Sequence, residues 1–284
     1  MGRGPAPIAL SVIALQASGV GVSAMIAYVA ESVGDPSKYG LAYSIYRAFL
    51  IASSLTLSAL FVALGEGALA LVALLSLTGF GLRFPLKEFI KPSHRLTIRQ
   101  LAPDLRELRD KPALLYSLIL APTTYLLYSL SPYYRSVYGV GMEVIAGFYA
   151  ALSAIPMLTA PLGGALIDRF GHIKLLIASS ATYSVLMAIF ALPMGVIQSF
   201  TVALLGALTF DVLQAALNVY LAAVTTEGER GRVNSIRLFY WLLLSVPAPY
   251  LAGAILSLNP KLLTIPIVLA AALYSAALRR TLRT

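Results

Sequence analysis

Long apolar runs dominate the sequence and decide what the chain can fold into. Nine of them lie between charged or Gly- and Pro-rich breaks, at roughly 8–30, 40–63, 67–82, 113–131, 143–167, 174–194, 197–223, 234–257 and 261–279. Runs near ~20 residues match the length of a helix that crosses the hydrocarbon layer of a bilayer. We therefore predict an all-α, polytopic integral membrane protein with about nine transmembrane helices.

Charge is too scarce for a water-soluble protein of this size. Of the 284 residues, 59% are hydrophobic and 12% are charged, whereas soluble domains carry about a quarter charged residues. This composition excludes a soluble enzyme, a disordered chain and a nucleic-acid-binding protein. The chain has no cysteine, and its sequence has no P-loop, Ser-His-Asp pattern or metal-ligand spacing. The sequence therefore predicts no enzyme, no cofactor and no metal site.

Residues 83–112 form the only long hydrophilic stretch and carry 12 of the 33 charged residues. We predict that they link a partial bundle of three helices, 1–82, to a six-helix bundle, 113–284. Leu101, Leu105 and Leu108 follow a helical spacing, which predicts a short amphipathic helix on the headgroup layer. A solvated linker without such a helix is the alternative interpretation.

The positions of Lys and Arg predict the orientation in the membrane. If the C-terminus is cytoplasmic, 17 basic residues fall in inside segments and three in outside segments. Cytoplasmic loops carry such an excess of Lys and Arg. We therefore expect the 83–112 linker and the C-terminus to be cytoplasmic, in a multi-pass protein of the plasma membrane. The same asymmetry accounts for the net charge of +9.

A short loop between the fifth and sixth runs carries the most specific motif. It reads Gly, three residues, Asp-Arg, one residue, Gly, and then a basic position, at Gly164, Asp168, Arg169, Gly171 and Lys174. This pattern resembles the signature loop of the major facilitator superfamily, although His172 and Ile173 stand where that family often has Arg or Lys.

The resemblance implies two facing six-helix bundles joined by a cytoplasmic linker. Runs four to nine look like the whole second bundle, and runs one to three look like the last three helices of the first. The first three helices are therefore apparently lacking, either because the chain is a fragment or because it is a reduced form. The resemblance also implies that Asp168 pairs with the opening turns of the second run, Gly40 to Arg47, and closes the inner face.

Polar residues within the apolar runs are the candidates for substrate or ion binding. Asp211 lies mid-run, and Gln214 and Asn218 follow at i+3 and i+7, so all three share one helix face. A carboxylate near the bilayer centre costs ~2.5–3.5 kcal/mol and is a functional candidate for that reason. It can take up a proton or hold a cationic group of the substrate. The alternative is interhelical hydrogen bonding that only stabilises the bundle.

Further candidates are weaker. Tyr125 and Tyr128 follow Pro122 at helical spacing, Gln16 is the only amide in the first run, and Arg47 lies two turns into the second. The tyrosines can line a substrate cavity, although tyrosines at this spacing more often serve in packing. Gln16 is a candidate for ligand contact, and we expect Arg47 to have an inner-gate or structural role rather than to contact substrate. We expect the remaining tyrosines near the outer surface to form an aromatic belt, namely Tyr133, Tyr134 and Tyr138.

Together these features predict a secondary active or facilitative transporter that moves a small solute by alternating access, surrounded by membrane lipids. A proton or cation is the possible coupling ion, and nucleic acid is excluded as a partner. Two alternatives stay open. The first is that the chain is an inactive, truncated transporter fragment. The second is that it is a non-transporting membrane scaffold or sensor that acts through the 83–112 linker.

Overall fold

A computed structural model describes residues 104–123 and 130–282. Within these ranges the chain is helical and contains no strand. The elements are η2 (Leu105–Leu108), α5 (Pro112–Ser117), η3 (Leu118–Leu120), α7 (Leu130–Tyr138), α8 (Met142–Phe170), α9 (His172–Phe190), α10 (Val196–Val224), α11 (Glu227–Ser245), α12 (Ala248–Leu258), η4 (Pro260–Leu263) and α13 (Thr264–Leu282). Among the described residues, four helical segments are long and apolar enough to cross a membrane, namely 172–190, 196–224, 229–258 and 260–282.

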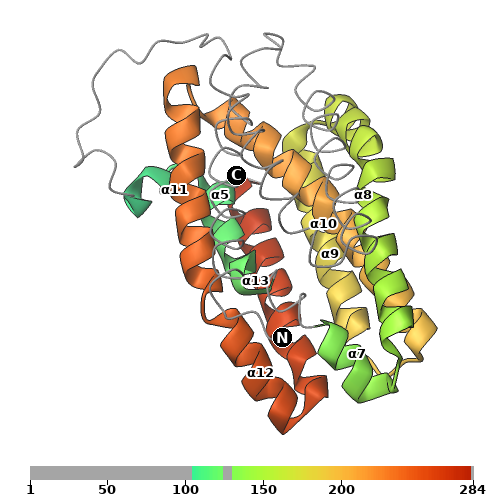
Figure 1. The fold of residues 1–284 in the computed structure, drawn as a ribbon. Helices are drawn as coiled ribbons and strands as arrows, with labels where there is room; N and C mark the ends of the chain where they lie inside the picture. The colour runs from blue at the N-terminus through green and yellow to red at the C-terminus, as the bar shows by residue number, and fades with distance from the viewer. Residues whose placement is uncertain (1–103, 124–129, 283–284) are drawn as a thin grey trace, which may run out of the picture.

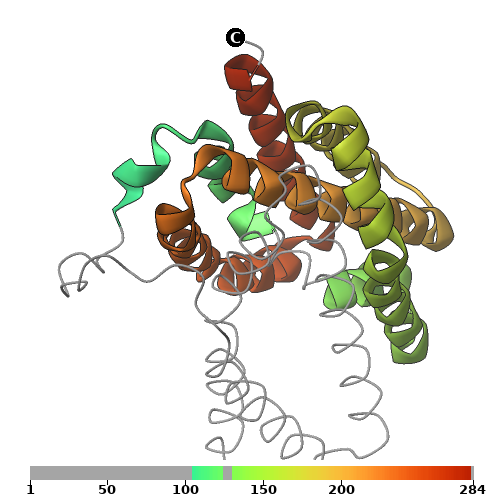
Figure 2. The same cartoon turned by 90° about the horizontal axis from the view of Figure 1, so that it is seen from above.

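The long helices form an antiparallel bundle. α10 packs against both α8 and α9, and α13 packs against α9. α5 and α13 lie between α10 and the tandem pair α11–α12 (Figure 1). Viewed from above, α10 crosses the bundle between α8 and the start of α11 (Figure 2). The bundle has two ends: the Gly171 end, with the α8–α9 and α10–α11 turns, and the Asn259 end, with the α9–α10 and α12–η4 turns.

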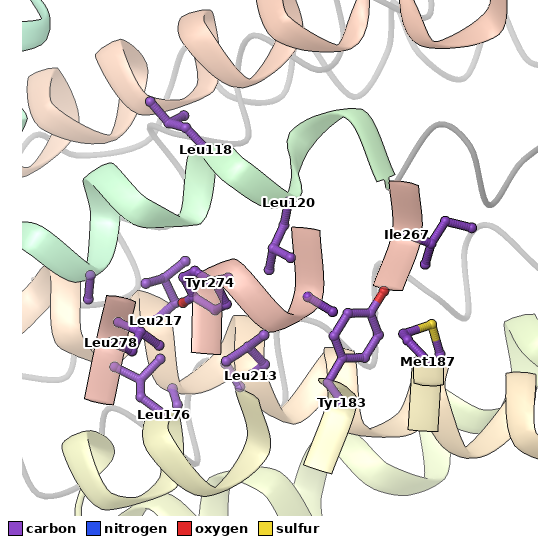
Figure 3. Packing of buried hydrophobic residues seen from close by; sticks show 14 of the residues in the cluster. Leu118, Leu120, Leu176, Tyr183, Met187, Leu213, Leu217, Ile267, Tyr274 and Leu278 are labelled. Carbon is purple, nitrogen blue, oxygen red and sulfur yellow. The ribbon is translucent and has the colours of Figure 1, made fainter. Parts of the chain in front are cut away.

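The core lies where α5, η3, α9, α10 and α13 meet. Figure 3 shows Leu213 and Leu217 of α10 beside Leu176 of α9 and Tyr274 of α13. All four side chains are fully buried. Large apolar side chains on the outer faces are exposed instead, for example Ile197 and Leu258. An apolar exterior around an apolar core is what a bilayer requires of a spanning bundle.

Two of the expected apolar runs are interrupted in the structure. The run 113–131 contains α5, which passes directly into the 3-10 helix η3. The run 234–257 is divided into α11 and α12 at Val246 and Pro247. Proline has no backbone N–H and its ring obstructs the preceding turn, so Pro122 and Pro247 account for an interruption at each place.

The end of the hydrophilic linker differs from its expectation. Residues 105–108 form a single 3-10 turn whose Asp104 side chain accepts a hydrogen bond from the Arg106 N–H at 2.9 Å. Leu108 is fully buried against the protein, and η2 packs on α11. A helix lying on the headgroup layer is therefore wrong for this turn. Leu101 lies outside the described residues.

Candidate functional site

The polar face expected on α10 forms a gradient of burial. Asp211 and Gln214 are half-buried, and Asn218 is 6% exposed. Asp211 lies ~22 Å along the helix from Val196 and ~20 Å from Val224, at 1.5 Å per residue. The structure thus places a carboxylate halfway along an apolar helix of 29 residues.

Asn218 makes its hydrogen bonds within the protein. Its Nδ2 donates to the Gln214 carbonyl at 2.8 Å, and its Oδ1 accepts from Arg237 Nη2 on α11 at 3.5 Å. Both ends of this amide are therefore oriented by neighbouring groups. Asn218 joins α10 to α11, whereas Asp211 and Gln214 lie further along the same face towards the middle of the helix.

A second polar face, on α11, meets the first. Arg230, Asn234 and Arg237 lie at i, i+4 and i+7, and they are 4%, 1% and 4% exposed. Arg230 Nη2 donates to the Ala222 carbonyl near the end of α10 at 3.1 Å. The two helices are thus joined twice by guanidinium groups.

Sequence reasoning missed Arg237 because it counted that residue only as a basic residue of an inside segment. The signal was present, since Arg230, Asn234 and Arg237 repeat the helical spacing that identified the α10 face.

The signature-loop residues lie together at the Gly171 end. Gly171 is the only residue between α8 and α9, and its φ of 83° is a conformation that favours glycine. Its N–H donates to the Ile167 carbonyl at 2.8 Å and so ends α8. Asp168, Arg169 and Lys174 are exposed around this turn. The Arg169 guanidinium lies 5.4 Å from the ring centroid of Phe170.

Upstream of the turn lie two buried glycines, of which Gly163 faces α10. A Cβ atom at Gly163 would lie 3.7 Å from Val212 of α10, which is ordinary van der Waals contact. Gly164 is also buried. This small-residue surface lets α8 approach α10 closely along their contact.

Ion pairs tie the end of the linker to α11. Glu107 of η2 pairs with Arg232, and Lys111 pairs with Glu229 at 3.7 Å. Acidic and basic partners alternate between the two segments, so each segment supplies one charge of each sign. Together with buried Leu108, these pairs fix the segment that leads into α5.

The Asn259 end contains an aromatic cluster. Tyr134 is fully buried, and its ring centroid lies 4.4 Å from Phe200 and 5.4 Å from Phe148. Phe148 and Phe200 stack at 4.3 Å. The Ser199 hydroxyl donates to the Tyr134 oxygen at 3.0 Å. The expectation of a lipid-facing belt is therefore wrong for Tyr133 and Tyr134, because the fold turns both rings inward.

Four site candidates, Gln16, Arg47, Tyr125 and Tyr128, lie outside the described residues. Within those residues, no group of three or more His, Cys, Asp or Glu side chains is arranged to hold a metal ion. The predicted site residues that the structure describes thus fall into two groups: the α10 face near mid-bundle and the signature loop at the Gly171 end.

Fold and sequence pattern together define an all-α, multi-pass membrane protein. The family model described as Major Facilitator Superfamily matches residues 6–249. The chain therefore belongs to the major facilitator superfamily, whose members are membrane transporters rather than enzymes. Comparison with curated proteins finds no match.

Proposed function

We propose that this protein moves a small solute across the plasma membrane by alternating access, with Asp211 at the centre of the pathway. The observation that carries the proposal is the position of this carboxylate, half-buried and halfway along the apolar helix α10. An ionisable side chain at that depth is retained where it serves a solute, an ion or a proton. Gln214 extends the same face by one turn. Asn218 is bonded within the protein and acts in positioning the helices.

The chemistry of a carboxylate limits what it can do in the transport cycle. When ionised it accepts hydrogen bonds and attracts a cationic group, and when protonated it donates one hydrogen bond. Asp211 therefore either holds a cationic group of the solute or takes up a coupling proton during the cycle. Either role requires the carboxyl group itself, because an amide of the same shape carries no charge and does not titrate.

Transport by purified protein in proteoliposomes tests this role. A panel of radiolabelled sugars, amino acids and carboxylates, together with the lipophilic cation tetraphenylphosphonium, is offered with and without a pH gradient. Asp211→Asn should abolish uptake of the transported solute or remove its dependence on the pH gradient, with little change in thermal stability. Glu143→Gln, at an exposed acid in the first turn of α8, is the matched control and should transport normally. Full transport by Asp211→Asn contradicts the proposal.

We place the Gly171 end in the cytoplasm. The support is the distribution of 17 basic residues against three along the sequence. Because the chain has no native cysteine, Ser93→Cys and Ser136→Cys provide unique labelling sites. An impermeant thiol reagent added to intact cells should label the variant at 136 and spare the variant at 93. Labelling of the variant at 93 would show the opposite orientation.

For the inner gate we propose that Asp168 pairs with the opening turns of the second apolar run, between Gly40 and Arg47. Asp168 is exposed one turn before Gly171, and a carboxylate is stabilised beside a helix N-terminus or a guanidinium. A double-mutant cycle of Asp168→Asn and Arg47→Ala measures the coupling. The pairing predicts non-additive effects on the population of the inner-open state, and strictly additive effects would remove it.

A further inference from the structure

The interruption between α11 and α12 lies near the middle of the longest apolar segment. Ser245 ends α11 about 27 Å from Glu227 and about 21 Å from Asn259, at 1.5 Å per residue. Pro247 offers no N–H, and the Val246 N–H is shared between the Leu242 and Leu243 carbonyls at 3.1 and 3.3 Å. A shared donor at a proline is the usual local compensation for a broken helical ladder, and it leaves the helix free to bend there.

A second interruption lies beside the first. Ala121 follows the 3-10 helix η3, and its N–H bonds three residues back, to the Leu118 carbonyl. The Ser245 hydroxyl donates to the Ala121 carbonyl at 3.0 Å and lies 2.6 Å from the Trp241 carbonyl of its own helix, α11. A hydroxyl has one proton for these two acceptors. Ser245, which is 2% exposed, therefore joins two helix interruptions through a bond that it can exchange for an intrahelical one.

Beyond the interruption, α12 takes a direction different from that of α11. Figure 1 shows α12 bending away from the axis of α11 on the side of α7. α12 packs mainly on η4, which packs on α7 and leads directly into α13. The fully buried residues of α12 are small, Ala248 and Ala252, whereas Tyr250 and Leu258 are 81% and 82% exposed. Contacts made by alanines lose little when a helix shifts, because a methyl group has few atoms to repack.

We propose that the α11–α12 junction is a hinge pinned by the Ser245 hydroxyl. While the hydroxyl bonds the Ala121 carbonyl, α11 is held to the segment after η3. When it bonds only Trp241, α12 swings about Val246 and Pro247 while η4 stays with α13. The proposal rests on the proposed transport function only in that such a swing opens the Asn259 end to solute. The motion itself can be measured without any solute.

Distance measurements between spin labels in lipid nanodiscs test the hinge. Labels on Leu258→Cys and Leu192→Cys join the tip of α12 to the end of α9, and labels on Phe239→Cys and Leu192→Cys do the same for α11. All three positions are exposed. A swing of ~15° on the ~16 Å length of α12 displaces its tip by about 4 Å. Ser245→Ala should shift or broaden the Leu258–Leu192 distribution by about that amount and leave the Phe239–Leu192 distribution unchanged.

Ser184 supplies a matched control. Its hydroxyl also lies between a carbonyl of its own helix, Ser180 at 2.8 Å, and a carbonyl of another helix, Ala271 at 2.7 Å. Ser184 joins uninterrupted stretches of α9 and α13, so Ser184→Ala should change neither distribution. Ser245→Thr, which keeps the hydroxyl, should behave as the wild type.

A variant with the opposite effect covers the case in which Ser245→Ala does not fold. Pro247→Ala restores the missing backbone donor and should narrow the Leu258–Leu192 distribution. The hinge is overturned if Ser245→Ala leaves that distribution unchanged, if it moves both label pairs alike, or if Ser184→Ala has the same effect. An unchanged width in Pro247→Ala also overturns it. Full uptake by Asp211→Asn, with the Ser245→Ala distances shifted as expected, contradicts the proposed function and leaves the hinge standing.

Discussion

At the Gly171 end, arginines, amides and carboxylates join the helices, whereas at the Asn259 end aromatic rings do so. Arg237 and Arg230 reach from α11 to α10, and Glu107 and Lys111 pair with α11. At the other end Tyr134, Phe148 and Phe200 pack ring against ring.

The two kinds of contact respond differently to movement. Hydrogen bonds to guanidinium groups depend on direction and separation, and a buried polar group that loses its partner costs free energy at once. Aromatic pairs tolerate tilted and edge-to-face arrangements with small differences in energy. The Gly171 end should therefore occupy a few discrete arrangements, while the Asn259 end can repack continuously.

Tyr134→Ala should give the largest loss of stability, about 3 kcal/mol, because it removes a fully buried ring from the centre of the cluster. Tyr134→Phe removes only the hydrogen bond from Ser199 and should cost about 1 kcal/mol. Denaturant titration in detergent micelles measures both. Equal losses in the two variants would mean that the hydroxyl, not the packing, holds this end.

At the Gly171 end, Arg237→Met keeps most of the side-chain volume and removes the donors. Its expected cost is about 2 kcal/mol, since hydrogen bonds to charged groups contribute ~1.5–3 kcal/mol. The cost should fall clearly in an Asn218→Ala background, because the acceptor is then absent. Arg280→Met, at an exposed site on α13, is the control. If Arg237→Met left the free energy of unfolding unchanged, packing and not hydrogen bonding would hold both ends.

Gly171→Ala tests the turn that defines its end of the bundle. A side chain at a φ of 83° and a ψ of 146° costs roughly 1–3 kcal/mol, because this region is essentially restricted to glycine. Gly253→Ala is the matched control, because a Cβ atom there meets no neighbour within 4 Å and its backbone is helical. Alanine is favoured over glycine in a helix, so the control should be neutral or slightly stabilising. Thermal unfolding of both variants gives the comparison.

Glu107→Gln should have a smaller effect, within about 0.5 kcal/mol, because the Glu107 and Arg232 side chains are 28% and 45% exposed and solvent screens such pairs. In low salt, hydrogen exchange of the α11 N-terminal turns should be faster in the variant than in the wild type. In 0.5 M NaCl the variant and the wild type should exchange alike. A difference that persists in high salt would indicate a role beyond this ion pair.

The smallest expected effect concerns pH at the aromatic end. Burial raises the pKa of Tyr133 to about 12, and Tyr138 beside it adds to the shift. The phenol is therefore neutral in both the folded and the unfolded chain below pH 10, so hydrogen exchange of α7 should not change between pH 6 and 9 once its intrinsic rate is corrected. Above pH 10 the unfolded chain ionises first and stability should fall towards pH 12. Tyr133→Phe should show a weaker fall.

Helix positions were largely predictable, because an apolar run of ~20 residues has few alternatives. The runs 143–167, 174–194 and 197–223 correspond to α8, α9 and α10 within a few residues. The interruptions were not predicted, although Pro122 and Pro247 are plain in the sequence. A proline in an apolar run either bends a helix or divides it, and neighbours such as the Ser245–Ala121 contact decide which.

The α10 face was predictable from spacing alone, and the structure adds its partner. Counting basic residues by segment hid Arg237, because that count ignores which face of a helix a residue occupies. Tyr134 was assigned to lipid because tyrosines near a membrane surface commonly lie there. Its burial depends on Phe148 of the next helix and on Phe200 of α10, and no pattern within one helix reports such contacts.

The single-residue connection at Gly171 acts as a pivot between α8 and α9. Chain ends one residue apart cannot separate, so any relative motion of the two helices is a rotation about that point. α9 has 19 residues and is ~28 Å long, so a rotation of ~10° moves its far tip by about 5 Å and its near tip by almost nothing. Displacement therefore grows in proportion to distance from the pivot. A rotation that leaves the signature loop in place causes its largest displacement beside the aromatic cluster.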